Sequence, residues 1–117
     1  MRRSLLACAL LVLAGCGSES RVGPDAQAEQ GRLLLQQFGC GGCHKIPGVA
    51  AAEGTIGPPL AGIAERVYLA GVLPNTPDNM VHWIRAPQRV DPLTAMPDLN
   101  VTEAHARAMV AYLYRLR

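Results

Sequence analysis

Apolar side chains recur at helical spacing along much of the chain, and no stretch alternates between apolar and polar residues as a half-buried strand does. The spacing predicts a first helix over residues 25–37. The Asp25 carboxylate suits its N-terminus, and Leu34 and Leu35 lie on its apolar side. Gly31 within it costs about 1 kcal/mol relative to alanine, which indicates either the close approach of another helix or a tolerated glycine.

A loop punctuated by glycine and proline, residues 46–59, precedes a second helical pattern. The apolar positions that follow the loop are spaced at i, i+3, i+4 and i+7, which predicts a short amphipathic helix. These positions are Leu60, Ile63, Ala64 and Val67.

A third helix is predicted to begin at Thr76-Pro77-Asp78, which has the form of an N-cap, a proline at the first helical position and an acid in the first turn. Pro87 ends this helix, because proline disfavours the helical conformation at the preceding Ala86. Its apolar face consists of Met80, Trp83 and Ile84.

The last helix is predicted to begin around Thr102, whose hydroxyl can cap it, and to end near Arg115 and Arg117, whose charges suit the C-terminal end of the helix dipole. Together the patterns predict an all-α fold of about four short helices. The core stripe of the last helix is Ala106, Met109, Val110 and Leu113.

The N-terminus has the pattern of an export signal. Residues 1–15 join a basic start to an apolar run too short to cross a hydrocarbon layer of about 30 Å. Residues 13–16 resemble a bacterial lipoprotein processing site, in which Cys16 becomes the first mature residue and carries acyl chains. The alternative is cleavage nearby, with Cys16 incidental. The lipoprotein pattern predicts a domain at 25–117 that faces the periplasm or another extracytoplasmic space, anchored to a bacterial membrane by the lipidated Cys16 and a linker, residues 16–24.

Composition limits the mature part to one small domain. Removing 15 of the 117 residues leaves 102, enough for one domain and not for two. In that part nine basic side chains balance nine acidic ones, because Arg2 and Arg3 leave with the signal. A chain so close to neutral gives no reason to expect a nucleic-acid partner.

The segment Cys40-Gly41-Gly42-Cys43-His44 carries the chemistry. Two thiols and an imidazole at this spacing are typical of covalent haem attachment. The thiols add across the haem vinyl groups, and His44 supplies a nitrogen ligand to the iron from one face. The motif predicts a c-type cytochrome with one covalent haem c. Because the chain has only one Phe, one Trp and three Tyr, the haem would supply much of the apolar core.

Two other kinds of site fit the motif less well. A zinc site normally takes four ligands, and beyond the motif the mature chain offers no second cysteine pair and only His82 and His105. A thioredoxin-like redox pair needs a parallel-sheet context, whereas the apolar pattern is helical nearly everywhere.

The second axial ligand decides between an electron carrier and a haem catalyst or gas binder. Met96 lies between Pro92 and Pro97 on a loop that cannot form a regular helix, and a loop stiffened by proline holds a weak ligand with little loss of entropy. We predict ligation by Met96, with His82 as the main rival. The other candidates are Met80 and Met109, which fall on apolar stripes and are expected in the core, and His105, which is expected to be solvated.

The chain from 25 to 117 resembles the class I monohaem cytochromes c. Residues 57–60 are similar to the Gly-Pro-x-Leu turn of that family, and residues 92–96 resemble its Pro-x-Thr-x-Met arrangement. The resemblance implies a small cytochrome c fold wrapped around one haem. It also implies that the carbonyl of Pro58 accepts a hydrogen bond from His44.

The same resemblance assigns roles to further residues. Arg66 and the Thr94 hydroxyl would reach haem propionates, and Trp83 would pack on the haem beside the methionine. In the family the first and last helices cross at a glycine and an aromatic, which suggests that Gly31 meets Tyr112 or Leu113. Two features depart from the mitochondrial relatives: Gly31 lies nine residues before Cys40, where they usually have eight, and Lys45 is the single lysine, so their basic docking ring is absent.

These features predict a membrane-tethered electron carrier that is not an enzyme and has no small-molecule substrate. Its expected partners are a quinol-oxidising complex as donor and a terminal oxidase as acceptor. Two alternatives stay open: a haem enzyme or a gas- or peroxide-responsive protein with an open sixth site, and a haem subunit permanently bound to an oxidase.

Overall fold

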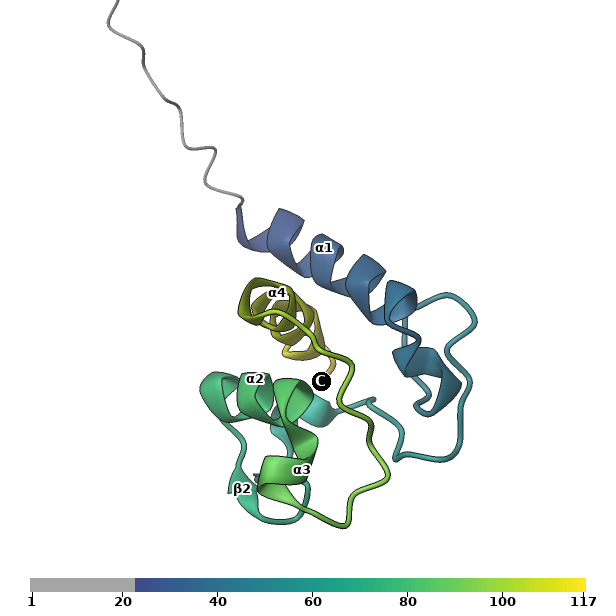
Figure 1. Cartoon of the computed structure of the whole chain (residues 1–117). Helices are drawn as coiled ribbons and strands as arrows, with labels where there is room; N and C mark the ends of the chain where they lie inside the picture. Colours follow the sequence, from purple (N-terminus) through teal and green to yellow (C-terminus); the bar gives the residue numbers. More distant parts are fainter. Residues whose placement is uncertain (1–22) are drawn as a thin grey trace, which may run out of the picture.

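The computed structural model describes residues 23–117, so the predicted signal peptide and the predicted lipid attachment at Cys16 lie outside the described residues. None of the helices in the described part is both long and apolar enough to span a membrane. The elements are α1 (Pro24–Gln37), β1 (Tyr68–Leu69), β2 (Leu73–Pro74), α2 (Pro77–Arg85), α3 (Pro87–Val90) and α4 (Glu103–Leu113), with 3₁₀ turns at Cys40–Gly42 and Ile63–Glu65 (Figure 1).

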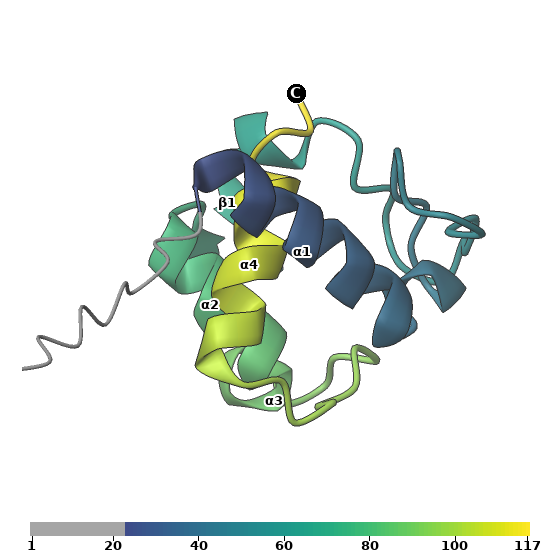
Figure 2. The same ribbon diagram turned by 90° about the horizontal axis from the view of Figure 1, so that it is seen from above.

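The centre of the fold is the crossing of α1 over α4, which Figure 2 shows from above. Gly31 makes this crossing possible, because a Cβ at this position would lie 1.8 Å from the carbonyl oxygen of Ala108. The predicted approach of another helix to Gly31 is therefore confirmed. The closest approach is to the backbone at Ala108 and Met109, about one helical turn before the suggested Tyr112 or Leu113.

Hydroxyl caps fix the starts of α2 and α4 as predicted. The Oγ1 of Thr76 accepts a hydrogen bond from the backbone N–H of Asn79 at 3.2 Å, and the Oγ1 of Thr102 accepts one from His105 at 3.2 Å. The helix α2 ends before Ala86, also as predicted. Pro87 does more than end it, since it occupies the first position of the short helix α3, where its fixed φ is favourable.

The helix predicted around residues 60–67 is wrong, because only the 3₁₀ turn Ile63–Glu65 forms there. Gly62 takes a left-handed conformation with φ of 68°, which interrupts a continuous helix. Ile63 is buried as expected, but Val67 is 73% exposed. The tiny hairpin of β1 and β2 was also not predicted, because two paired residues per strand are too few to show alternation.

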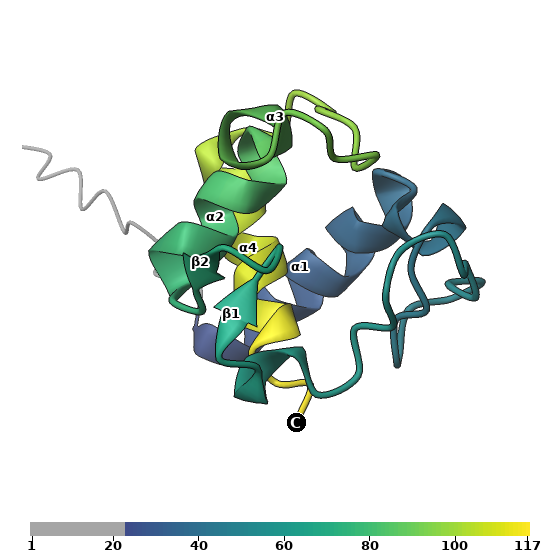
Figure 3. The same ribbon diagram turned by 90° about the horizontal axis from the view of Figure 1, so that it is seen from below.

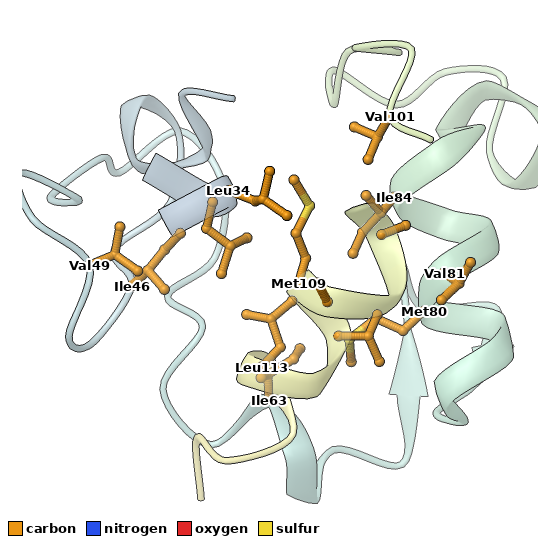
Figure 4. Close-up of a cluster of buried hydrophobic side chains, with 14 of the residues drawn as sticks. Leu34, Ile46, Val49, Ile63, Met80, Val81, Ile84, Val101, Met109 and Leu113 are labelled. Carbon is orange, nitrogen blue, oxygen red and sulfur yellow. The ribbon is translucent and has the colours of Figure 1, made fainter. Parts of the chain in front are cut away.

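The core lies between α1, α2 and α4 and extends to the loop after residue 44. Figure 4 shows the Met109 side chain of α4 between Leu34 on one side and Ile84 and Val101 on the other. The predicted stripe of α4 is buried throughout: Ala106, Met109, Val110 and Leu113 are each at most 5% exposed. The described part is therefore a small, mostly helical fold in which α4 is the central element.

Candidate haem site

The attachment motif is wound into a compact turn directly after α1. Cys40–Gly42 form a 3₁₀ turn, and the backbone N–H of His44 donates to the carbonyl of Cys40 at 3.0 Å. The turn is entered through Gly39, whose φ of 72° favours glycine. A Cβ at Gly41 would lie 2.6 Å from Ala52, so this glycine permits the turn to pack against the following loop.

The two thiols are free and half-buried. Burial raises the pKa of the Cys40 thiol, and the nearby Cys43 raises it further, so Cys40 favours the neutral thiol. The motif therefore presents two separate thiols, as the formation of two thioethers requires.

His44 is fixed by the segment that follows the loop. Its Nδ1 lies 2.8 Å from the carbonyl oxygen of Pro58, which is the predicted hydrogen bond. The backbone at Gly57 packs against the imidazole, since a Cβ at this position would lie 2.3 Å from Cε1 of His44. The N–H of Gly57 also donates to the backbone carbonyl of Cys43 at 2.8 Å. When Nδ1 carries the proton and donates it to Pro58, Nε2 has a free lone pair that can bind a metal.

A cavity of about 340 Å³ opens beside this imidazole. Its size lies within the range of about 300–1,000 Å³ that is usual for cofactor sites. In Figure 3 the segment that follows α1 and the loop that follows α3 lie opposite each other. Both segments line the cavity, which brings together Cys40, Cys43, His44, Pro58, Trp83, Thr94 and Met96 of the predicted site residues.

The loop that carries Met96 is held by hydrogen bonds as well as by its prolines. The backbone N–H of Met96 donates to Oγ1 of Thr94 at 3.2 Å, and its carbonyl accepts from Nε2 of Gln88 at 2.8 Å. At the start of the loop the N–H of Leu93 donates to the Asp91 carboxylate at 3.0 Å. The thioether is therefore presented by a largely fixed backbone, which lowers the entropy lost when it binds a metal.

Arg66 is the predicted site residue that does not line the cavity. Its guanidinium donates to the backbone carbonyls of Pro59 and Ala61 instead. Its contact with a haem propionate stays a prediction.

The rival ligands lie elsewhere or have other roles. Met80 is 2% exposed and belongs to the core, and His82 is exposed on α2 and does not line the cavity. Met109 is a core residue that also contributes to the cavity wall. His105, which was expected to be solvated, is only partly exposed: its ring lies edge-on to Phe38 at 5.8 Å and its Nδ1 is buried, where α4 begins near the end of α1.

Several wall residues were not predicted as site residues. Leu35, Ile84 and Leu113 lie on the helical stripes, and the periodicity that marks them as core gives no signal that they face a cavity. Gly57 was quoted only as part of a turn, and its contact with the imidazole depends on the fold. The remaining wall residues are Gly39, Ile56, Ala70, Ala95, Pro97, Leu99 and Val101.

The donors on the walls fit an iron porphyrin. Two thiols and an imidazole lie beside a largely apolar cavity, and a thioether lies on the loop that closes it. In residues 23–117 no group of three or more His, Cys, Asp or Glu side chains gathers where it could hold a metal ion. The fold and the site together define a c-type haem protein that carries electrons.

Comparison with known proteins identifies the family. The family model "Cytochrome c" matches residues 28–117, and the chain belongs to the cytochrome c family. Members of this family bind haem c covalently, and Cys40, Cys43 and His44 are the residues of this chain that form the attachment motif.

Two relatives carry the description "Cytochrome c oxidase subunit 2". The chain is 33% identical over 104 residues to the protein of Alkalihalophilus pseudofirmus, an alignment that covers 88% of this chain and 30% of that protein. It is 29% identical over 97 residues to the protein of Bacillus sp. strain PS3, which covers 80% of this chain and 27% of that protein. The chain thus spans less than a third of the length of either relative. No solved structure matches the chain.

Proposed function

We propose that the protein is a membrane-tethered carrier with a single haem, ligated by His44 and Met96, that passes single electrons from a quinol-oxidising complex toward a terminal oxidase. The observation that carries the proposal is the cavity wall, which combines the attachment cysteines, an oriented imidazole and a thioether. When bound, haem supplies an iron that alternates between the ferrous and ferric states.

The chain contributes by keeping the ligands in place during that change. Pro58 orients His44 and raises the basicity of its ring. The hydrogen bonds at Thr94 and Gln88 hold the Met96 backbone, so little rearrangement accompanies the gain or loss of an electron. The apolar wall excludes water and, together with a thioether ligand, favours a high potential.

The proposal predicts that Met96→Ala opens the sixth position. The weak near-infrared band of oxidised methionine-ligated haem should be present in the parent protein and lost in the variant, and the variant should bind carbon monoxide rapidly. Met80→Leu is the matched control, because this core methionine lies outside the cavity wall and the exchange nearly conserves volume. Rapid carbon monoxide binding by the parent protein would instead favour a haem enzyme or sensor.

The membrane tether is a separate part of the proposal and rests on the sequence of residues 1–16. Cells grown with a labelled fatty acid should yield a labelled protein in the membrane fraction, and Cys16→Ser should abolish both the label and the membrane association. Several acyl chains anchor a protein stably, whereas one chain binds marginally. A membrane-bound Cys16→Ser protein would contradict the lipid anchor.

A second candidate function is a fixed haem subunit of an oxidase, favoured by the description of both relatives. The two functions differ in how firmly the protein is held. A carrier separates from the oxidase during purification in detergent at moderate salt, whereas a fixed subunit stays with it in constant ratio.

A further inference from the structure

The side chain of Asn75, between β2 and α2, joins three parts of the chain. Its Nδ2 donates to the carbonyl oxygens of Ile63 and Arg66, each at 2.8 Å, and its Oδ1 accepts from the Tyr114 hydroxyl at 2.7 Å. Its backbone N–H donates to the carbonyl of Val67 at 2.9 Å. Asn75 therefore ties the segment around the 3₁₀ turn to the C-terminal end of α4.

The segment held by Asn75 leads directly to the haem ligand. The Arg66 guanidinium donates to the carbonyl of Pro59, and the carbonyl of the preceding Pro58 lies 2.8 Å from Nδ1 of His44. Between 57 and 62 the described chain forms no helix or strand. Two backbone hydrogen bonds hold its first half, from the N–H of Gly57 to the carbonyl of Cys43 at 2.8 Å and from the N–H of Leu60 to the carbonyl of Lys45 at 2.9 Å. Side-chain hydrogen bonds from Arg66 and Asn75 hold the second half, at the carbonyls of Pro59, Ile63 and Arg66.

Tyr114 is suited to complete this network. Its hydroxyl group donates to Oδ1 of Asn75 at 2.7 Å, and the residue as a whole is half-buried. A tyrosine hydroxyl, whose ordinary pKa is about 10, is protonated and able to donate at neutral pH, and burial raises the pKa of Tyr114 further.

We infer that Asn75 is a positioning residue which, with Tyr114 and together with the backbone hydrogen bonds of Gly57 and Leu60, fixes the segment 57–66 so that the carbonyl of Pro58 stays on His44. This inference rests on the proposed function, because it concerns the iron ligand. A hydrogen bond from Nδ1 raises the basicity of the ligating nitrogen. A more basic ligand favours ferric iron, so a loosened segment shifts the reduction potential upward.

Tyr114→Phe tests the inference with the smallest change, since it removes one hydroxyl and keeps the ring. Tyr112→Phe is the matched control. It removes a hydroxyl from the same helix that donates to the carbonyl of Pro47 at 2.6 Å, outside the segment 57–66.

A second pair of variants removes whole amides. Asn75→Ala deletes three side-chain hydrogen bonds, and Asn79→Ala deletes one, from Nδ2 to the carbonyl of Pro74 at 2.9 Å. If Asn75→Ala does not fold, the Tyr114→Phe pair alone decides.

The readouts are the exchange rate of the Nδ1 proton of His44, measured by NMR on the reduced haem protein, and the reduction potential. Loss of one hydrogen bond of the network should speed the exchange roughly fivefold in Tyr114→Phe and more in Asn75→Ala, with an upward shift of the potential in both. The controls should keep the parent values. A lower free energy of unfolding with unchanged exchange and potential would overturn the inference, as would equal changes in the controls.

Haem content separates this inference from the proposed function. Purified parent protein that carries no covalent haem overturns both. Covalent haem with a parent-like exchange rate in Tyr114→Phe overturns the positioning role alone.

Discussion

At the scale of single residues, the haem site depends on glycines without a side chain as much as on the residues that bind the haem. His44 is held between the Pro58 carbonyl at 2.8 Å and the bare backbone of Gly57, where a Cβ would lie 2.3 Å from the ring. The attachment motif identifies His44 as the ligand. The orientation of the His44 ring, however, depends on a segment more than ten residues later in the sequence. Gly57 is therefore a glycine whose substitution acts directly on the ligand.

We predict that Gly57→Ala displaces the imidazole. Overpacking of this kind costs about 1–3 kcal/mol, which should lower the melting temperature by at least about 4 °C in a domain of this size. The reduction potential should change as well, because the ring moves relative to Pro58. Thermal unfolding and potentiometry check both effects.

Gly42→Ala is the control for this experiment. It adds the same methyl group within the attachment motif, but a Cβ there meets nothing within 4 Å. Equal losses in the two variants would show that the contact with the imidazole is not what makes Gly57 necessary.

At the scale of elements, α1 and α4 form the framework on which the cavity is built. The attachment motif follows α1, and the wall residues Met109 and Leu113 belong to α4. The distance between these helices therefore sets the width of the cavity at one end. Gly31 controls that distance, since its Cα faces the backbone at Ala108.

We predict that Gly31→Ala destabilises the fold. In an isolated helix this change would be favourable by about 1 kcal/mol, but here the added Cβ lies 1.8 Å from the Ala108 oxygen, so the helices must separate. A loss of about 1–3 kcal/mol or more in the free energy of unfolding is expected. Denaturant unfolding measures it.

Gly23→Ala provides the comparison at the N-cap of α1, where a Cβ meets nothing within 4 Å. Its effect should stay below about 1 kcal/mol. A stabilised Gly31→Ala protein would contradict the close crossing.

At the scale of the whole molecule, the cavity is large for so small a domain. The cavity of about 340 Å³ is lined mostly by apolar side chains, and apolar surface in contact with water contributes no hydrophobic stabilisation. Small domains are stable by about 5–15 kcal/mol in total. We therefore expect folding and haem binding to be coupled, because a bound haem would cover this apolar wall.

We predict that the double variant Cys40→Ala with Cys43→Ala, made without haem, loses much of its helical circular dichroism and its cooperative melting transition. The parent protein with haem should show both. A haem-free variant with full helicity and a sharp transition would contradict the coupling.

The charges of the molecule are balanced locally. Residues 23–117 hold eight basic and eight acidic side chains, since three arginines and one glutamate precede them. Six of each sign lie in ion pairs, at N–O distances from 2.6 to 3.6 Å. Exposed pairs add little stability, but they cancel the long-range field of the protein.

The surface beside the cavity is uncharged at Leu93. This residue directly precedes Thr94 of the cavity wall and is 94% exposed.

We therefore predict that electron exchange depends weakly on salt. The rates with a small anionic and a small cationic metal complex should each change by less than about twofold between ionic strengths of about 0.01 and 0.1 M, whereas strong steering changes rates by 10-fold or more. Leu93→Lys places a charge beside the cavity and should make the two rates respond in opposite directions. A steep salt dependence in the parent protein would reveal a field that the ion pairs do not cancel.

The sequence alone determined the features that depend on neighbours along the chain. The N-caps Thr76 and Thr102, the buried stripe of α4 and the attachment motif are local patterns, because a cap or a helical face involves residues within about one or two turns. The family could be recognised from the same motifs, since their order and spacing are written directly in the chain.

Only the tertiary structure decided what depends on contacts between distant segments. In place of the predicted helix around residue 63, the structure has a 3₁₀ turn whose Ile63 carbonyl accepts a hydrogen bond from the side chain of Asn75. The structure also places the His105 ring against Phe38. It also brought Gly57 onto the imidazole and gave Gly31 its partner at Ala108. These outcomes follow from how α1, α4 and the loops pack in space, which local spacing does not specify.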